Sequence, residues 1–141
     1  MTGLELMQAL QRGELPAPGI ATLLGMDVLE VERGRCVFAL DPGPQHGNPI
    51  GTTHGGILAT LLDSCVGCAV HTELGEGDTY TTLELKVNYL RPVMAGAGRI
   101  VAEGTTIHVG GRVATAEGRI HGADGKLVAH GTTTCLITRA V

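Results

Sequence analysis

The chain has 141 residues, a net charge of −4 at neutral pH and only three aromatic residues. This length fits one domain, residues 1–141, in which folding should bury roughly two-thirds of the surface that the unfolded chain exposes. We expect no nucleic-acid partner, because the net charge is negative, aromatic residues are scarce and no Lys/Arg cluster is present. No apolar run reaches the roughly 20 residues that span a bilayer, so we expect no membrane association.

The four cysteines predict free thiols. The N-terminal segment lacks the long apolar run of a signal peptide, so we expect a cytoplasmic location. Cys65 and Cys68 form a C-x-x-C pair without a second pair at zinc-finger spacing, and we interpret both as small core residues. The histidines form neither an i, i+4 pair nor an H-E-x-x-H helix, so we predict no metal site.

The first 24 residues predict a helical preamble. Thr2 is a suitable N-cap for a short amphipathic helix that ends near residue 12. Glycines and prolines then separate this helix from a second apolar segment, residues 20–26. Residues 28–40 predict two short strands folded about Arg33-Gly34-Arg35.

The rest of the chain predicts one loop, one long helix and four strands. Residues 41–53 are rich in Pro, Gly, Asn and Thr and predict the loop. The helix is expected over residues 54–74, enclosed on all sides because apolar residues occur nearly all round it. Strands are expected over residues 81–90, 99–109, 112–121 and 127–138. This order predicts an α+β fold, with a six-stranded antiparallel sheet wrapped around one central helix.

Asp63 is the only charged residue within the most apolar stretch, residues 57–70. Burial of a carboxylate without partners destabilises a fold, so we expect Asp63 to have a functional role. His54, Gly55 and Gly56 come just before this stretch and would supply accessible backbone N–H groups and an imidazole at the helix N-terminus. A carboxylate and an anion-stabilising helix end make a candidate catalytic pair.

Three segments carry a family resemblance. They are N-P-I-G-T-T-H-G-G-I-L-A-T-L-L-D at residues 48–63, T-L-E-L-K-V-N-Y-L-R-P at residues 82–92 and H-V-G-G-R at residues 108–112. Together they resemble the hotdog-fold acyl-CoA thioesterases of the phenylacetate-pathway type. The resemblance implies hydrolysis of an acyl-CoA or aryl-CoA thioester without a cofactor, because coenzyme A is part of the substrate.

The resemblance also implies roles for individual residues. Asp63 would act as nucleophile or as general base on water, and the backbone N–H of Gly55 would polarise the thioester carbonyl. Asn48 would orient the carbonyl or water, His54 would position the substrate, and Thr82 would hold the attacking water. Coenzyme A contacts are implied for Tyr89, Arg91, His108, Gly110, Gly111 and Arg112. Some relatives have Glu at the position of Asp63, and another subgroup has Thr at the position of Gly67. These differences leave open whether Asp63 acts as the nucleophile or as the general base.

Helix geometry predicts a shared active site. Gly55 and Asp63 are eight residues apart, which is about 12 Å along one helix and too far for both to meet one carbonyl. A two-fold axis that sets two such helices antiparallel would bring Gly55 of one chain to Asp63 of the other. We therefore expect a homodimer with two shared sites, within a homotetramer. The acyl group is expected between subunits, against Leu61, Leu62 and Cys65.

Two other functions fit the same fold. One is a non-catalytic acyl-CoA sensor, although a sensor has no need for the carboxylate of Asp63. The other is a hydratase or dehydratase, which would need a paired acid and His arranged differently from this lone acid.

Overall fold

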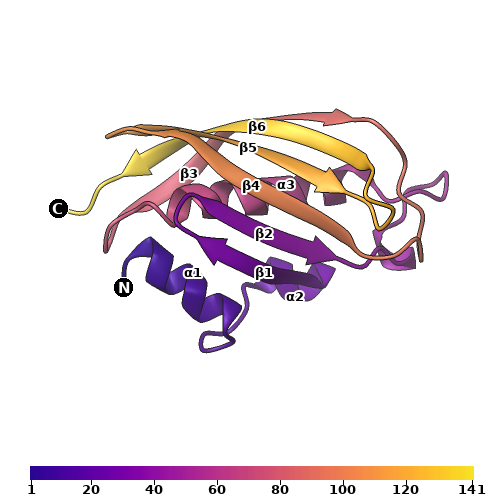
Figure 1. Cartoon of the computed structure of the whole chain (residues 1–141), viewed down its shortest axis with the longest axis horizontal. Coiled ribbons are helices and arrows are strands. Elements are labelled where there is room, and N and C mark those ends of the chain that lie inside the picture. Colours follow the sequence, from indigo (N-terminus) through magenta and orange to yellow (C-terminus); the bar gives the residue numbers. More distant parts are fainter.

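The computed structural model describes all 141 residues and contains three α-helices, one 3₁₀ turn and six strands (Figure 1). The helices are α1 Gly3–Gln11, α2 Gly19–Leu24 and α3 Gly55–His71, and the 3₁₀ turn is Pro44–His46. The strands are β1 Met26–Glu32, β2 Arg35–Leu40, β3 Thr79–Tyr89, β4 Ile100–Val109, β5 Val113–His121 and β6 Leu127–Thr138. Every predicted helix and strand is present, with ends that differ by up to three residues. None of the helices combines the length and apolarity needed to cross a bilayer.

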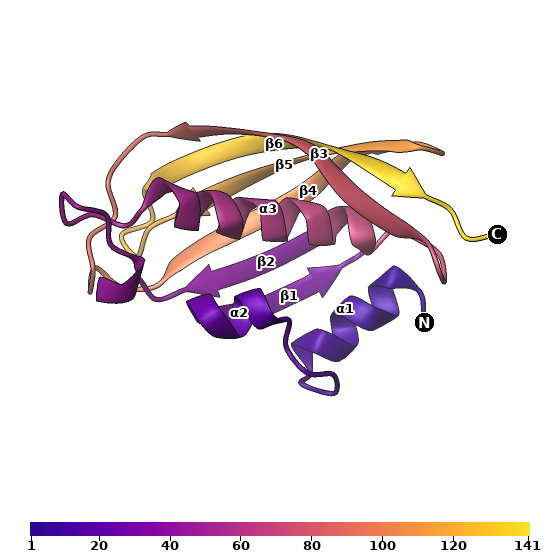
Figure 2. The same ribbon diagram turned by 180° about the vertical axis from the view of Figure 1, so that it is seen from behind.

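All six strands form one sheet in the order β1-β2-β4-β5-β6-β3, with every pair antiparallel. The sheet curves around α3, which packs against its concave face, while α1 and α2 lie beside β1 at one edge (Figure 2). This arrangement is the hotdog fold, as predicted.

The sheet covers one face of α3. Its buried side chains are apolar and form the centre of the core: Leu58, Leu61, Leu62, Cys65, Val66, Ala69 and Val70. The opposite face includes Thr60, Asp63 and Ser64, which are only half-buried. The expectation that the helix is enclosed on all sides is therefore wrong for a single chain, because β1 and β3 do not meet across it.

A β-bulge interrupts the regular alternation of side chains in β3. The pairing of β3 with β6 shifts between Thr82 and Glu84, which leaves Leu83 unpaired and 59% exposed. A bulge reverses the facing of the side chains that follow it. Thr82 and Leu85 consequently both face α3, although strict alternation would place them on opposite sides.

The N-terminal helices are tied to α3 and to the loop before it. The Thr2 hydroxyl accepts the N–H of Glu5, which confirms Thr2 as the N-cap of α1. The N–H of Gly3 donates to the carbonyl of Leu74 at 3.0 Å, so α1 begins against the chain that leaves α3. The carbonyl of Leu24, at the end of α2, lies 2.9 Å from Nε2 of the buried His46.

The close approach at Gly3 leads to a stability prediction. A Cβ at this position would overlap the carbonyl oxygen of His71, which is backbone and cannot swing aside. We expect Gly3→Ala to lower the free energy of unfolding by about 1 to 3 kcal/mol, as overpacking does. Gly19→Ala is the matched control, because nothing lies within 4 Å of a Cβ there. Urea titration of both variants measures the difference, and equal stability would contradict the prediction.

Candidate active site

Asp63 forms a hydrogen-bonded pair with Thr82. The Thr82 hydroxyl donates to Oδ1 of Asp63 at 3.0 Å, which joins the middle of α3 to β3. The bulge at Leu83 makes this contact by turning Thr82 inward. Asp63 is half-buried rather than fully buried, because it lies on the face of α3 that the sheet leaves uncovered. The carboxylate is thus held by one donor while its other oxygen receives no hydrogen bond from the protein.

A cavity of about 220 Å³ lies beside this pair, and we call it the Asp63 cavity. It occupies the gap between the two sheet edges, with α1 and α2 along one side and α3 and β3 along the other. Its apolar walls include Met7, Leu10, Ile20, Ala21, Met26 and Phe38, and its polar members are Asp63, Ser64, Cys68, Tyr80 and Thr82. The predicted lining by Leu61, Leu62 and Cys65 is wrong, because all three are 0% exposed in the core under the sheet.

Tyr80 and Cys68 form a neutral part of the cavity wall. Burial raises the pKa of Cys68 to about 12 and raises the pKa of Tyr80 above its ordinary value. The Tyr80 ring also stands over Gly67, where a Cβ would lie 3.0 Å from the ring. The Tyr80 ring therefore fills the space that a threonine side chain at position 67 would need. Sequence reasoning did not single out Tyr80, since one aromatic residue in a strand is most simply a core residue.

The N-terminus of α3 offers a free backbone donor. Nδ1 of His54 accepts the N–H of Gly56 at 2.8 Å, so the imidazole caps the helix. The Tyr89 hydroxyl donates to the carbonyl of Gly55 at 2.8 Å and holds the first turn in place. The N–H of Gly55 has no acceptor within the chain, as expected for the first residue of a helix whose cap serves the next N–H. This donor is available to a ligand oxygen.

The Asn48 side chain organises the loop before α3. Its Oδ1 accepts the N–H groups of Ile50 and Thr52, and its Nδ2 donates to the Thr52 hydroxyl at 2.7 Å. All three bonds stay inside the loop. In the free chain, Asn48 therefore shapes the approach to the α3 N-terminus, and its role toward a substrate stays a prediction.

The buried Thr53 hydroxyl, next to His54, is the one buried side-chain oxygen or nitrogen that has no hydrogen-bond partner. Because an unsatisfied buried hydroxyl destabilises a fold, Thr53→Val should raise the free energy of unfolding by about 1 kcal/mol. Thr52→Val is the matched control: it removes the acceptor of Asn48 and should lower stability by about 1 kcal/mol. Thermal and urea unfolding of both variants test this, and a destabilised Thr53→Val would contradict it.

The six residues predicted to contact coenzyme A fall into two groups. Tyr89 and Arg91 lie at the end of β3, beside the start of β6. The Arg91 guanidinium donates there to the carbonyl of Leu127 at 3.1 Å. The turn of residues 108–112 lies at the other end, where Val113 pairs with Leu136. The part of β6 between Leu127 and Leu136 separates the two groups by roughly 30 Å. One chain therefore does not bring them together.

Arg139 holds the turn of residues 108–112. Its guanidinium donates to the carbonyls of Gly110 at 2.8 Å and Gly111 at 3.0 Å, and it also pairs with Asp78 at 2.9 Å. The Arg112 guanidinium and the His108 ring form no hydrogen bond within the chain. Arg139 therefore fixes the backbone of the turn, while the side chains of His108 and Arg112 are free to meet a ligand.

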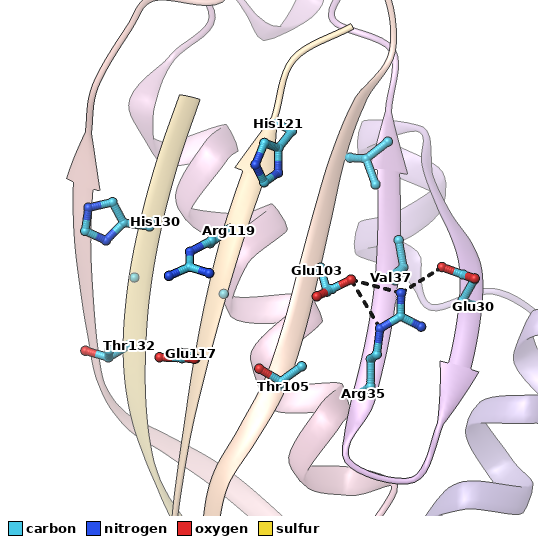
Figure 3. Close-up of a pocket in the computed structure, with 13 residues that line it drawn as sticks. Glu30, Arg35, Val37, Glu103, Thr105, Glu117, Arg119, His121, His130 and Thr132 are labelled. Atoms are coloured by element: carbon cyan, nitrogen blue, oxygen red, sulfur yellow. Dashed lines mark hydrogen bonds and ion pairs between the residues drawn. The ribbon is translucent and has the colours of Figure 1, made fainter. Parts of the chain in front are cut away.

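A second hollow of about 320 Å³ lies on the outer face of the sheet, away from α3 (Figure 3). It is crossed by ion pairs from Arg35 to Glu103 at 2.9 Å and to Glu30 at 3.0 Å. None of the predicted site residues lines it. The Asp63 cavity is the candidate active site because the Asp63–Thr82 pair lines it.

The comparisons with known proteins identify the family of this chain. A family model described as the thioesterase superfamily matches residues 50–129. A candidate esterase of Halobacterium salinarum is 33% identical over 70% of this chain and 67% of its own length. A Listeria monocytogenes protein named 1,4-dihydroxy-2-naphthoyl-CoA hydrolase is 26% identical over 65% of this chain and 73% of its own length.

A solved structure supports the same assignment. It is a phenylacetic acid degradation-related protein from Ralstonia eutropha JMP134, described as a candidate thioesterase. It superposes with a TM-score of 0.83 at 31% identity, and the match covers 92% of this chain and 98% of that one. The chain belongs to the thioesterase superfamily, and it is a thioester hydrolase with the hotdog fold of the phenylacetate-pathway type.

Proposed function

We propose that this enzyme hydrolyses an acyl-CoA or aryl-CoA thioester to the free acid and coenzyme A, with Asp63 as the reacting carboxylate. The observation that carries the proposal is the Asp63–Thr82 pair at the wall of a mostly apolar cavity. Asp63 acts as general base on water or as nucleophile, and Thr82 orients the carboxylate. Coenzyme A is part of the substrate, so the reaction needs no cofactor.

Thioester hydrolysis suits this small set of groups. Negative charge develops on the carbonyl oxygen, and a preorganised N–H at a helix N-terminus stabilises it. The leaving thiolate needs little help from an acid, because a thiol is far more acidic than an alcohol or an amine. One carboxylate and the N–H of Gly55 are therefore sufficient.

The two groups come from different chains in this proposal. Along one helix they are about 12 Å apart, and the half-buried face of α3 around Asp63 is open to a partner. The edge strand β3 adds support, because its outer backbone groups are unpaired along its length. A homodimer with antiparallel α3 helices places Gly55 of each chain opposite Asp63 of the other.

The same pairing unites the two predicted groups of coenzyme A contacts. Tyr89 lies at the N-terminal end of α3, bonded to Gly55. The turn of residues 108–112 lies beyond the C-terminal end of α3, since Gly34 joins Thr106 of β4 to Thr72 at the helix C-cap. Antiparallel helices bring opposite ends together. Tyr89 and Arg91 of one chain would then face Arg112 and His108 of the other, where guanidinium groups suit phosphates.

Thiol release from a panel of coenzyme A thioesters tests the activity. We expect turnover of at least one acyl- or aryl-CoA in the absence of metal or added cofactor. Binding of these thioesters without release of thiol would overturn the proposal and favour an acyl-CoA sensor.

A further inference from the structure

We infer that the Asp63 cavity is the acyl pocket and that its N-terminal walls, α1 and α2, select neutral apolar acyl groups of about six to eight carbons. The inference rests on the proposed function and goes beyond it by assigning acyl selection to the preamble of the same chain. It also replaces the predicted pocket lined by Leu61 and Leu62, which lie inside the core.

The wall chemistry excludes charged acyl groups. Most of the lining is hydrophobic, and no Lys, Arg or His lines the cavity. Tyr80 and Cys68 are held neutral by burial. The only charge is Asp63, which would repel a second carboxylate. A malonyl or succinyl group would therefore lose its hydration and meet a like charge.

The volume sets the size of the acyl group. An apolar protein cavity of about 150 Å³ holds one benzene molecule. The Asp63 cavity measures about 220 Å³, so it has space for a six-membered ring with one or two further carbons, or for a short branched chain. A chain of twelve or more carbons exceeds this volume unless α1 or α2 moves.

A small side chain forms part of the α2 wall of the cavity. Ala21 is the one buried residue of this six-residue helix, and no side chain caps its N-terminus. The Ala21 side chain lines the cavity and is small, whereas Leu23 of the same helix is 75% exposed and does not line it. Ala21 and the half-buried Leu10 of α1 thus control the free space opposite Asp63.

Three variants of the full chain test the inference through their acyl profiles. Ala21→Leu adds three carbon atoms to the wall and should lower the ratio of kcat/KM for phenylacetyl-CoA to that for butyryl-CoA about tenfold or more. Leu10→Ala removes three carbon atoms and should shift the optimum of a straight-chain series toward longer chains by about two carbons. Leu23→Ala is the matched control and should keep the wild-type profile.

The use of ratios separates selection from folding, because a misfolded variant loses all substrates together. Turnover with profiles unchanged in both Ala21→Leu and Leu10→Ala would overturn the inference and leave the proposed function standing. So would equal kcat/KM for succinyl-CoA and phenylacetyl-CoA. Absence of turnover on every thioester with the wild type would instead refute the proposed function itself.

Discussion

Asp63→Asn should lower kcat/KM for thioester hydrolysis by about 10²- to 10⁴-fold, the usual contribution of a positioned base. The amide keeps the size of the carboxylate and can still accept the Thr82 hydroxyl at its oxygen, but it neither takes a proton from water nor attacks a carbonyl. The cavity should therefore persist while the reaction fails. Thiol release under kcat/KM conditions measures the loss, and full turnover by Asp63→Asn would falsify the role of Asp63.

Thr82 provides the matched control for this prediction. Its hydroxyl bonds to a charged group, and such a bond contributes about 1.5 to 3 kcal/mol. Thr82→Val should therefore cost about 10- to 100-fold in kcat/KM, less than Asp63→Asn, and Thr82→Ser should restore most of the activity. Melting temperatures of all three variants close to that of the wild type would show that the losses are chemical.

The fold followed from patterns that are local in the sequence. The apolar run of residues 57–70, followed by Gly75 and Gly77, predicted α3. The tight-turn pairs Gly110-Gly111 and Asp124-Gly125 separated the last three strands. The enclosure of α3 could not be predicted in the same way. Apolar residues all round the helix predict that it is buried on every side. In one chain, however, Thr60, Asp63 and Ser64 face the gap between β1 and β3.

The candidate site depended on contacts that no local pattern records. Period-2 alternation in β3 does not reveal which residue is bulged, and the bulge at Leu83 is what turns Thr82 toward Asp63. The lining of the Asp63 cavity includes Met7 and Tyr80, which are separated by more than half of the sequence. The amphipathic pattern of α1 indicates that Met7 packs against something but does not say what. The family resemblance predicted roles for Asp63, Gly55 and Thr82. The residues that form the cavity wall could be identified only from the structure.

Mixing two inactive variants tests whether Gly55 and Asp63 act across a subunit boundary. Gly55→Pro removes the free N–H, and proline is tolerated at the first position of a helix. Losing one such donor costs about 10²- to 10³-fold in kcat. When Gly55→Pro and Asp63→Asn chains are unfolded together, refolded and allowed to pair at random, activity should recover to about one quarter of the wild-type value. Half of the dimers are then mixed, and each has one site with an intact Gly55 and an intact Asp63.

Gly55→Ala shows whether the loss in Gly55→Pro comes from the missing N–H or from the added Cβ. A Cβ at Gly55 would lie 3.2 Å from the Tyr89 ring in either variant, whereas only proline removes the donor. If the N–H is the oxyanion donor, Gly55→Ala should keep most of the activity that Gly55→Pro loses. Mixed chains that show no more thiol release than either variant alone would place both groups in one chain. The 12 Å rise between them would then require another donor beside Asp63.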